Sequence, residues 1–157
     1  MSRWWMVILV LCLGGCREQT VRLDAPAPEL SALNAVTGET ETLSRWRGTP
    51  VLLIFWSAGC GTCVAGLPDL EALSRQYKGK AQIVAVNIDP DVVDIHPLLH
   101  RTRLTLPVIR DPLGITRERY LVQAVPAAHF IDAGGILRRS FIGVPDRGEV
   151  AALFDML

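Results

Sequence analysis

The stretch VLLIFWSAGCGTC, residues 51–63, places an unbroken apolar run directly before a Cys-x-x-Cys pair. The run over residues 51–56 has the length of a strand, and residues 61–77 have a helical pattern. Cys60 and Cys63 therefore fall at the junction of a buried strand and the helix that follows it. A continuous apolar strand of this kind predicts a β-sheet that is covered on both faces.

Short apolar runs alternate with helical patterns through the rest of the chain. Residues 133–135, Ala-Gly-Gly, predict a hairpin turn and so an antiparallel pair of strands. Asp146, followed three residues later by Glu149, is a capping-box arrangement that predicts a final helix. We therefore predict an α/β fold in which a central mixed β-sheet is flanked by helices on both faces. The other expected strands are residues 82–88, 107–109, 128–132 and 136–142, and the other expected helices are a segment within 91–103 and residues 114–120.

The composition favours one packed domain without a nucleic-acid partner. The chain has 157 residues, half of them hydrophobic, and it carries 16 basic and 16 acidic residues. This length and apolar content suit a single core. No run of like charge gives the electrostatic footprint of nucleic-acid binding.

The N-terminus has the order of a bacterial signal peptide. Arg3 precedes an apolar run over residues 4–13, and two glycines then precede Cys16. Ten apolar residues in a helix cover about 15 Å, half of a hydrocarbon core, so a membrane-spanning helix fits poorly. Residues 13–16, Leu-Gly-Gly-Cys, resemble the lipobox of bacterial lipoproteins, in which the cysteine is acylated and becomes the first mature residue. We expect a signal peptide over residues 1–15 and lipidation of Cys16, with a buried N-terminal helix or an uncleaved anchor as the alternatives.

Residues 16–31 are expected to link the lipid to the domain. They are mostly polar and contain Ala-Pro-Ala-Pro at 25–28, which is typical of a short extended tether without regular secondary structure. Residues 32–157 then form the domain. A lipid anchor implies a location in the bacterial cell envelope, facing the periplasm or the cell exterior.

Cys60 and Cys63 are the candidates for a redox-active disulfide. At the start of a helix, free N–H groups and the macrodipole favour a thiolate, so Cys60 is the candidate nucleophile. The two intervening residues bring Cys63 back within reach, which makes it the candidate resolving thiol. A static disulfide over so short a loop would constrain the unfolded chain little. No metal site is expected, because a zinc ion needs about four ligands and the mature chain adds only His96, His100 and His129.

The sequence resembles the TlpA/ResA-like branch of the thioredoxin superfamily over nearly all of the mature chain. The resemblance implies a thioredoxin-like fold with an N-terminal extension, thiol-disulfide exchange with other proteins, and no cofactor. The stretches that carry it are APEL (27–30), LSRWRG (43–48), VLLIFW (51–56), the Cys-x-x-Cys, LP (67–68), VN (86–87), LPV (106–108), DPLG (111–114) and VPAAHFID (125–132).

The resemblance also implies further site residues. Pro126 is expected to be a cis-proline that faces the two cysteines, with the backbone of Val125 offered to an extended substrate segment. Trp56, Gly61 and Thr62 are expected to support the site. Thr62 stands where the family commonly has proline, so it restores an N–H group and adds a hydroxyl.

Asp89 and His129 differ from what the family pattern has at or near their positions. Asp89 is only an off-register neighbour of the acid that ResA-like proteins carry after the next strand, so the proton acceptor for Cys63 stays unassigned. His129 occupies a strand position where an apolar residue is usual, and we expect a buried, hydrogen-bonded histidine there. His96 and His100 are expected on the surface.

These observations predict a lipid-anchored thiol-disulfide oxidoreductase that reduces protein disulfides and is supplied by a membrane electron donor. The family context suggests apocytochrome c or other envelope proteins as substrates. A copper metallochaperone remains an alternative, because the same two thiols suit soft metals. A peroxiredoxin-type peroxidase is a further alternative, although only Ser57 approximates the threonine of its Thr-x-x-Cys context.

Overall fold

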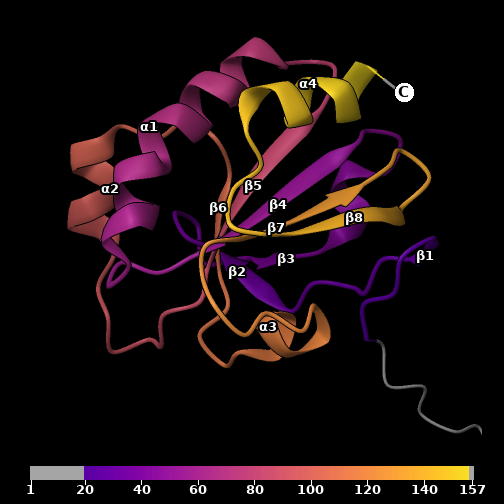
Figure 1. The fold of residues 1–157 in the computed structure, drawn as a ribbon. Helices are drawn as coiled ribbons and strands as arrows, with labels where there is room; N and C mark the ends of the chain where they lie inside the picture. The colour runs from indigo at the N-terminus through magenta and orange to yellow at the C-terminus, as the bar shows by residue number, and fades with distance from the viewer. Residues whose placement is uncertain (1–19, 156–157) are drawn as a thin grey trace, which may run out of the picture.

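The computed structural model describes residues 20–155 of the chain. The predicted signal peptide (1–15), the predicted lipidation site Cys16 and residues 156–157 lie outside this range. The described residues form one mixed sheet of eight strands in the order β1-β8-β7-β4-β5-β6-β2-β3, with helices on both faces (Figure 1). The strands are β1 (Ala25–Pro26), β2 (Ala32–Asn34), β3 (Thr40–Glu41), β4 (Val51–Trp56), β5 (Gln82–Asn87), β6 (Val108–Arg110), β7 (Ala127–Ile131) and β8 (Ile136–Ile142).

The central strand β4 is buried at all of its positions because the sheet is covered on both sides. It pairs in parallel with β5 and antiparallel with β7. Figure 1 shows helices covering both faces of the sheet, which confirms the predicted α/β class. The first face carries α1 (Gly61–Gln76), α2 (His96–Thr102) and α4 (Arg147–Asp155), and the second carries α3 (Ile115–Arg119) together with the 3-10 turn η1 (Leu43–Trp46).

Helix α1 is fixed to the sheet by an apolar stripe and by one buried carboxylate. Leu67, Leu70 and Leu73 pack into the core at helical spacing. Glu71 accepts hydrogen bonds from the backbone N–H groups of Thr105 and Leu106, just before β6. Burial alone would raise the pKa of Glu71, but these bonds and those from the Thr105 hydroxyl and Arg75 lower it to about 2. The carboxylate thus ties the middle of α1 to the chain that enters β6.

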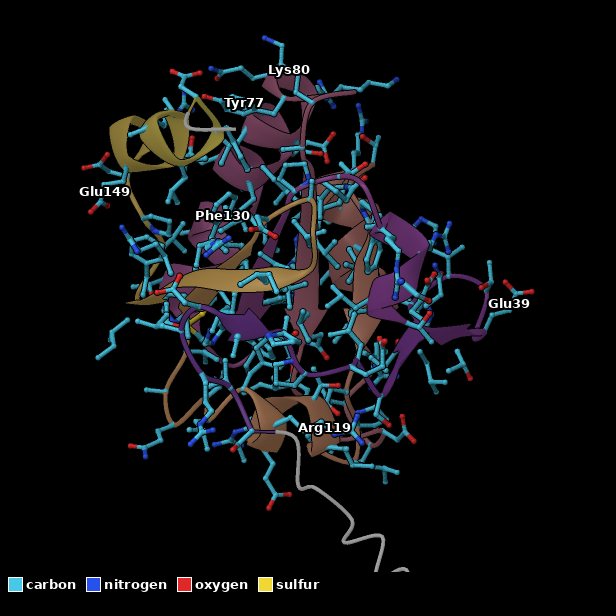
Figure 2. The ribbon with its side chains drawn as sticks, turned by 90° about the vertical axis from the view of Figure 1, so that its right-hand side faces the viewer. Glu39, Tyr77, Lys80, Arg119, Phe130 and Glu149 are labelled. Atoms are coloured by element: carbon cyan, nitrogen blue, oxygen red, sulfur yellow. A yellow bond between two sulfur atoms is a disulfide. The ribbon has the colours of Figure 1, made fainter. Side chains whose placement is uncertain are left out.

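The final helix α4 begins at the predicted capping box. The Asp146 side chain accepts from the Glu149 N–H, and the Glu149 side chain accepts from the Asp146 N–H. Phe154 lies against Tyr77 and Phe130, with ring centroids 4.5 and 5.6 Å apart. Figure 2 shows α4 lying over the end of the sheet beside Tyr77. The predicted final helix and its capping box are confirmed, and the described helix ends at Asp155.

The expected tether differs from the structure over residues 20–31. β1 adds to the edge of β8, with Ala25 opposite Leu137. The Ala27 N–H donates to Gly135, and Pro28 accepts from the buried Tyr120 hydroxyl. The prolines permit this pairing, because the residues that donate to the neighbouring chain, Asp24 and Ala27, both keep an N–H group. The prediction of an unstructured tether to residue 31 is therefore wrong for this part, since the segment covers a sheet edge that would otherwise be unpaired.

None of the helices within residues 20–155 has the length and apolar character needed to cross a membrane. The strands β2 and β3 were absent from the sequence prediction. They form a short antiparallel pair that extends the sheet beyond β6.

His129 is buried on β7, as predicted, and is 5% exposed. One ring nitrogen lies 2.9 Å from the Ser140 hydroxyl, and the ring packs edge-on against Phe55 and Tyr120. Burial lowers the pKa of His129 to about 4. The unfolded chain therefore binds a proton near pH 6.5 that the folded protein does not bind until about pH 4.

A His129→Leu variant should be more acid-resistant than the wild type. The wild-type protein loses stability as the pH falls below about 6.5, because protonation of His129 favours the unfolded chain. At pH 5 the difference between the two pKa values corresponds to about 2 kcal/mol, which the variant should regain. Urea titrations at pH 7 and pH 5 measure it, with His100→Leu on the surface as the matched control. Equal acid sensitivity of His129→Leu and wild type would contradict this account.

Candidate active site

Cys60 and Cys63 form a disulfide at the end of β4 and the start of α1. Their Cα atoms are 5.2 Å apart. β4 ends at Trp56, residues 57–59 turn the chain, and Cys60 is the N-cap residue of α1. The strand and helix that the sequence predicted are thus the two elements that position the pair.

The two cysteines differ in access. Cys63 is 4% exposed and lies inside the core cluster under α1, whereas Cys60 is partly exposed. The Cys63 N–H donates to the Cys60 sulfur over 3.2 Å, so a free N–H group at the helix start points at this atom. The Thr62 hydroxyl lies 3.3 Å from the same sulfur. A partner can therefore reach Cys60, and the helix terminus stabilises negative charge there.

The peptide bond between Val125 and Pro126 is cis, as the resemblance implied. The Val125 carbonyl oxygen lies 3.8 Å from the Cys60 sulfur, so this loop borders the disulfide. The Pro126 carbonyl accepts from the Gly143 N–H, which joins the loop to the end of β8. Trp56 is fully buried behind the site, and its indole N–H has no partner among the described residues. Gly61 opens α1 and is exposed.

Asp89 organises the turn that leads into Cys60, a role that sequence reasoning did not find. It is 8% exposed and accepts from the Ser57 hydroxyl at 2.5 Å and from the Ala58 N–H at 2.7 Å. Asn87 donates to it over 2.8 Å, and the Ser57 oxygen in turn accepts from Gly59. The signal available in the sequence was a polar pair at the end of a buried strand, Asn87 as the last residue of β5 and Asp89 just beyond it.

Asp89 is ionised at neutral pH. Burial alone would raise its pKa, but the bonds from Ala58, Ser57 and Asn87, with Arg110 nearby, hold the pKa below its usual value. The groups bonded to the Cys60 sulfur within the described residues are all neutral. The charged group that is bonded to the turn before Cys60 is therefore the Asp89 carboxylate, and its charge is negative.

The three histidines do not assemble with the cysteines. His96 bonds to the Asp94 carboxylate and lies 3.1 Å from the Ala35 carbonyl, and His100 is exposed. Residues 20–155 hold no cluster of three or more His, Cys, Asp or Glu side chains that could bind a metal ion.

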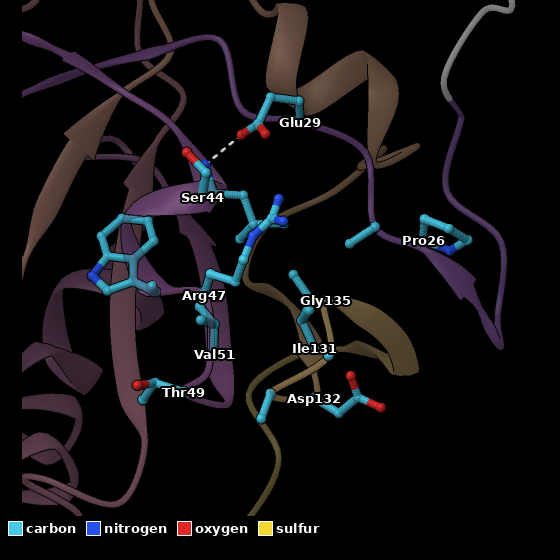
Figure 3. Close-up of a pocket in the computed structure, with 14 residues that line it drawn as sticks. Pro26, Glu29, Ser44, Arg47, Thr49, Val51, Ile131, Asp132 and Gly135 are labelled. Atoms are coloured by element: carbon cyan, nitrogen blue, oxygen red, sulfur yellow. Dashed lines mark hydrogen bonds between the residues drawn. The ribbon is translucent and has the colours of Figure 1, made fainter.

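A separate pocket lies at the opposite end of the central strands, where β4 begins and β7 ends (Figure 3). Its walls include Pro26, Arg47, Val51 and Asp132, and neither cysteine lines it. Glu29, on its border, accepts from the Leu43 N–H and so anchors η1.

Comparison with known proteins agrees with this geometry. Residues 23–140 match the AhpC/TSA family. The chain is 26% identical to the thioredoxin-like protein YneN of Bacillus subtilis, over 99% of both chains. It is 27% identical to the thiol-disulfide oxidoreductase ResA of Geobacillus kaustophilus, covering 85% of this chain and 76% of that one.

Solved structures show the same fold. The thiol:disulfide interchange protein DsbE of Chlorobium tepidum superposes with a TM-score of 0.76 and 28% identity, over 86% of this chain and 99% of the other. The fold, the Cys-x-x-Cys at a helix start and these relatives identify a protein-disulfide oxidoreductase with a thioredoxin-like fold. The chain belongs to the AhpC/TSA family, and it is similar to thiol-disulfide oxidoreductases named ResA and DsbE.

Proposed function

We propose that this enzyme reduces disulfides in proteins of the bacterial cell envelope, where Cys16 anchors it to a membrane. The observation that carries the proposal is the asymmetry of the disulfide. Cys60 is accessible at the start of α1, beside the backbone carbonyl of Val125, whereas Cys63 is buried behind it. Accessibility and the helix terminus support Cys60 as the thiol that attacks the substrate.

The exchange balances in two steps. The Cys60 thiolate attacks one sulfur of a substrate disulfide, which forms a mixed disulfide and releases one substrate thiolate. Cys63 then loses its proton and attacks the Cys60 sulfur, which releases the second substrate thiolate and closes the Cys60–Cys63 disulfide. Two electrons pass to the substrate, and a dithiol donor in the membrane must return them.

An extended substrate segment fits the Val125 backbone. The carbonyl of Val125 faces the Cys60 sulfur, so a strand-like segment that bonds to this backbone would hold its own cysteine at Cys60. Thr62 and Gly61 leave the approach open because they are exposed and small. Trp56 supports the site from beneath as a buried platform.

Three assays on one preparation distinguish this function from its alternatives. Insulin should be reduced with dithiothreitol as donor, and the Cys60→Ser variant should not support this reaction. A metallochaperone would instead show stoichiometric, tight Cu(I) binding with weak insulin reduction. A peroxidase would consume hydrogen peroxide faster than it reduces insulin.

Acylation of Cys16 is the prediction that tests the anchor. Mass spectrometry of the N-terminal peptide from the membrane fraction should show Cys16 as the first residue with added acyl chains. A Cys16→Ser variant should lose the modification and leave the membrane pellet, because a single peripheral contact anchors weakly. An unmodified Cys16 in the wild-type membrane fraction would refute the lipoprotein proposal and leave the redox proposal intact.

A further inference from the structure

A mostly apolar cavity of about 350 Å³ lies between residues 120–124, which follow α3, and the strands β7 and β8, and its function is not explained by disulfide exchange alone. Val21, Leu121 and Ile142 are among the residues that line it. We call these three residues and the cavity between them the Leu121 face. Buried Tyr120 and His129 also line the cavity, so the face continues into the core beneath the sheet edge.

Leu121 and Ile142 occupy positions that the folded domain alone does not favour. Leu121 has a φ of 53°, in the left-handed region that leucine rarely adopts, and its side chain is 57% exposed. Ile142 is 100% exposed. Neither backbone preference nor burial accounts for large apolar side chains at these positions. Exposed apolar residues that lie next to one another around a cavity indicate a surface that binds a ligand, another protein or a membrane.

The path of the N-terminal segment indicates that a membrane covers this surface. The Val21 N–H donates to the Arg119 carbonyl at the end of α3, so the chain is fixed to the domain at this point. Figure 2 shows Arg119 next to the place where the described chain begins. Cys16 precedes Val21 by five residues, and five residues span at most about 18 Å when fully extended. An acyl anchor on Cys16 would therefore hold the Leu121 face within that distance of the lipid.

We propose that the Leu121 face docks on the bilayer surface, with Leu121 and Ile142 among the lipid headgroups. This inference rests on the proposed acylation of Cys16. A linker of this length keeps Val21, and with it the Leu121 face that Val21 lines, close to the membrane. A bilayer also suits a face with a small number of large exposed apolar side chains, because it needs no shape complementarity.

The charge around the face is suited to anionic lipid. The segments that frame it, residues 20–22, 117–124 and 138–142, contain five arginines and a single acidic residue, Glu118. Arg138 is paired with Asp24 and Asp132. Arg22 and Arg139 are exposed, and within residues 20–155 neither forms an ion pair with a carboxylate. Basic side chains near a membrane surface gain energy from anionic headgroups.

Docking in this orientation has a consequence for the redox site. Ala124 lines the cavity, and its neighbour Val125 faces the Cys60 sulfur at 3.8 Å. Cys60 itself does not line the cavity. The disulfide therefore lies beside the docked face and not under it. Cys60 would then lie close to the membrane surface. It could react there with cysteines of a membrane-embedded donor or of an anchored substrate that lie at a similar distance from the bilayer.

Photocrosslinking tests the docking. The full acylated protein is reconstituted into vesicles of phosphatidylethanolamine and phosphatidylglycerol that contain a lipid with a diazirine near its headgroup. After irradiation, peptide mass spectrometry should place adducts on the peptides of Leu121 and Ile142 several-fold above those of Val36 and Val92. These two valines are exposed elsewhere on the domain and serve as internal controls.

Matched variants separate docking from folding. The double variant Leu121→Asp, Ile142→Glu should lose most adducts and keep the thermal midpoint of the wild type, because both positions are exposed and aspartate adopts positive φ more readily than leucine. The control variant Val36→Asp, Val92→Glu should keep the adducts. Equal labelling of all faces in protein with acylated Cys16 would overturn the docking alone. Unmodified Cys16 in the same preparation would overturn the anchor and the docking together, whereas insulin reduction tests the redox function independently.

Discussion

A Cys63→Ser variant should accumulate mixed disulfides with its partners and lose turnover by more than about a hundredfold. Cys60 would still attack a substrate disulfide, since its position at the start of α1 does not depend on the Cys63 sulfur. Resolution would stop, because Cys63 supplies the thiol that lies under Cys60. Affinity purification from cells, followed by non-reducing electrophoresis, should show covalent complexes that disappear with dithiothreitol.

The Cys60→Ser variant is the matched control. Cys63 is almost completely buried, so a substrate disulfide cannot approach it in the folded protein. This variant should trap no partners, and the double variant should behave in the same way. If Cys60→Ser traps partners and Cys63→Ser does not, the roles of the two cysteines are reversed, and the argument from the helix terminus is wrong.

The redox pair and the centre of the sheet could be predicted because their signals are local. An unbroken apolar run over 51–56 specifies a strand buried on both faces, and the observed β4 has these limits. The capping pair Asp146 and Glu149 likewise defined the start of α4. In each case the residues that determine the element lie close together in the sequence.

The parts that the sequence did not reveal depend on partners far along the chain. β1 exists because Ala25 and Pro26 lie against β8, more than a hundred residues later, and proline-rich composition by itself indicates an extended linker. Asp89 accepts hydrogen bonds from Ser57 and Ala58, which belong to the turn after another strand, β4. The cavity of the Leu121 face likewise combines the N-terminal segment with β8. Only the folded topology brings these residues together.

The redox potential should lie nearer to that of a reductant than to that of a strong oxidant. Known potentials run from about −270 mV for thioredoxin to about −120 mV for the strongest oxidant, a range of roughly 7 kcal/mol that reflects how well the reduced form is stabilised. Here the Cys60 sulfur has one neutral hydroxyl beside it, from Thr62. A neutral hydrogen bond contributes about 1 kcal/mol, or roughly 20 mV, which is too little to produce a strong oxidant. A measured potential above about −150 mV would overturn the proposed reductant role.

Asp89 provides a direct test of this electrostatic argument. Its ionised carboxylate is bonded to the turn before Cys60 and disfavours a thiolate there, so it should make the disulfide more reducing. Asp89→Asn removes the charge and can keep the hydrogen bonds, since the Ser57 hydroxyl can rotate to accept from the new amide. We expect a shift toward oxidising potential on the order of 30 mV, equivalent to about 1.4 kcal/mol. Equilibration with glutathione buffers and thiol alkylation measure it, with Asp91→Asn on the exposed loop as the control. An unchanged potential in Asp89→Asn would show that Asp89 shapes the turn without affecting the charge balance at Cys60.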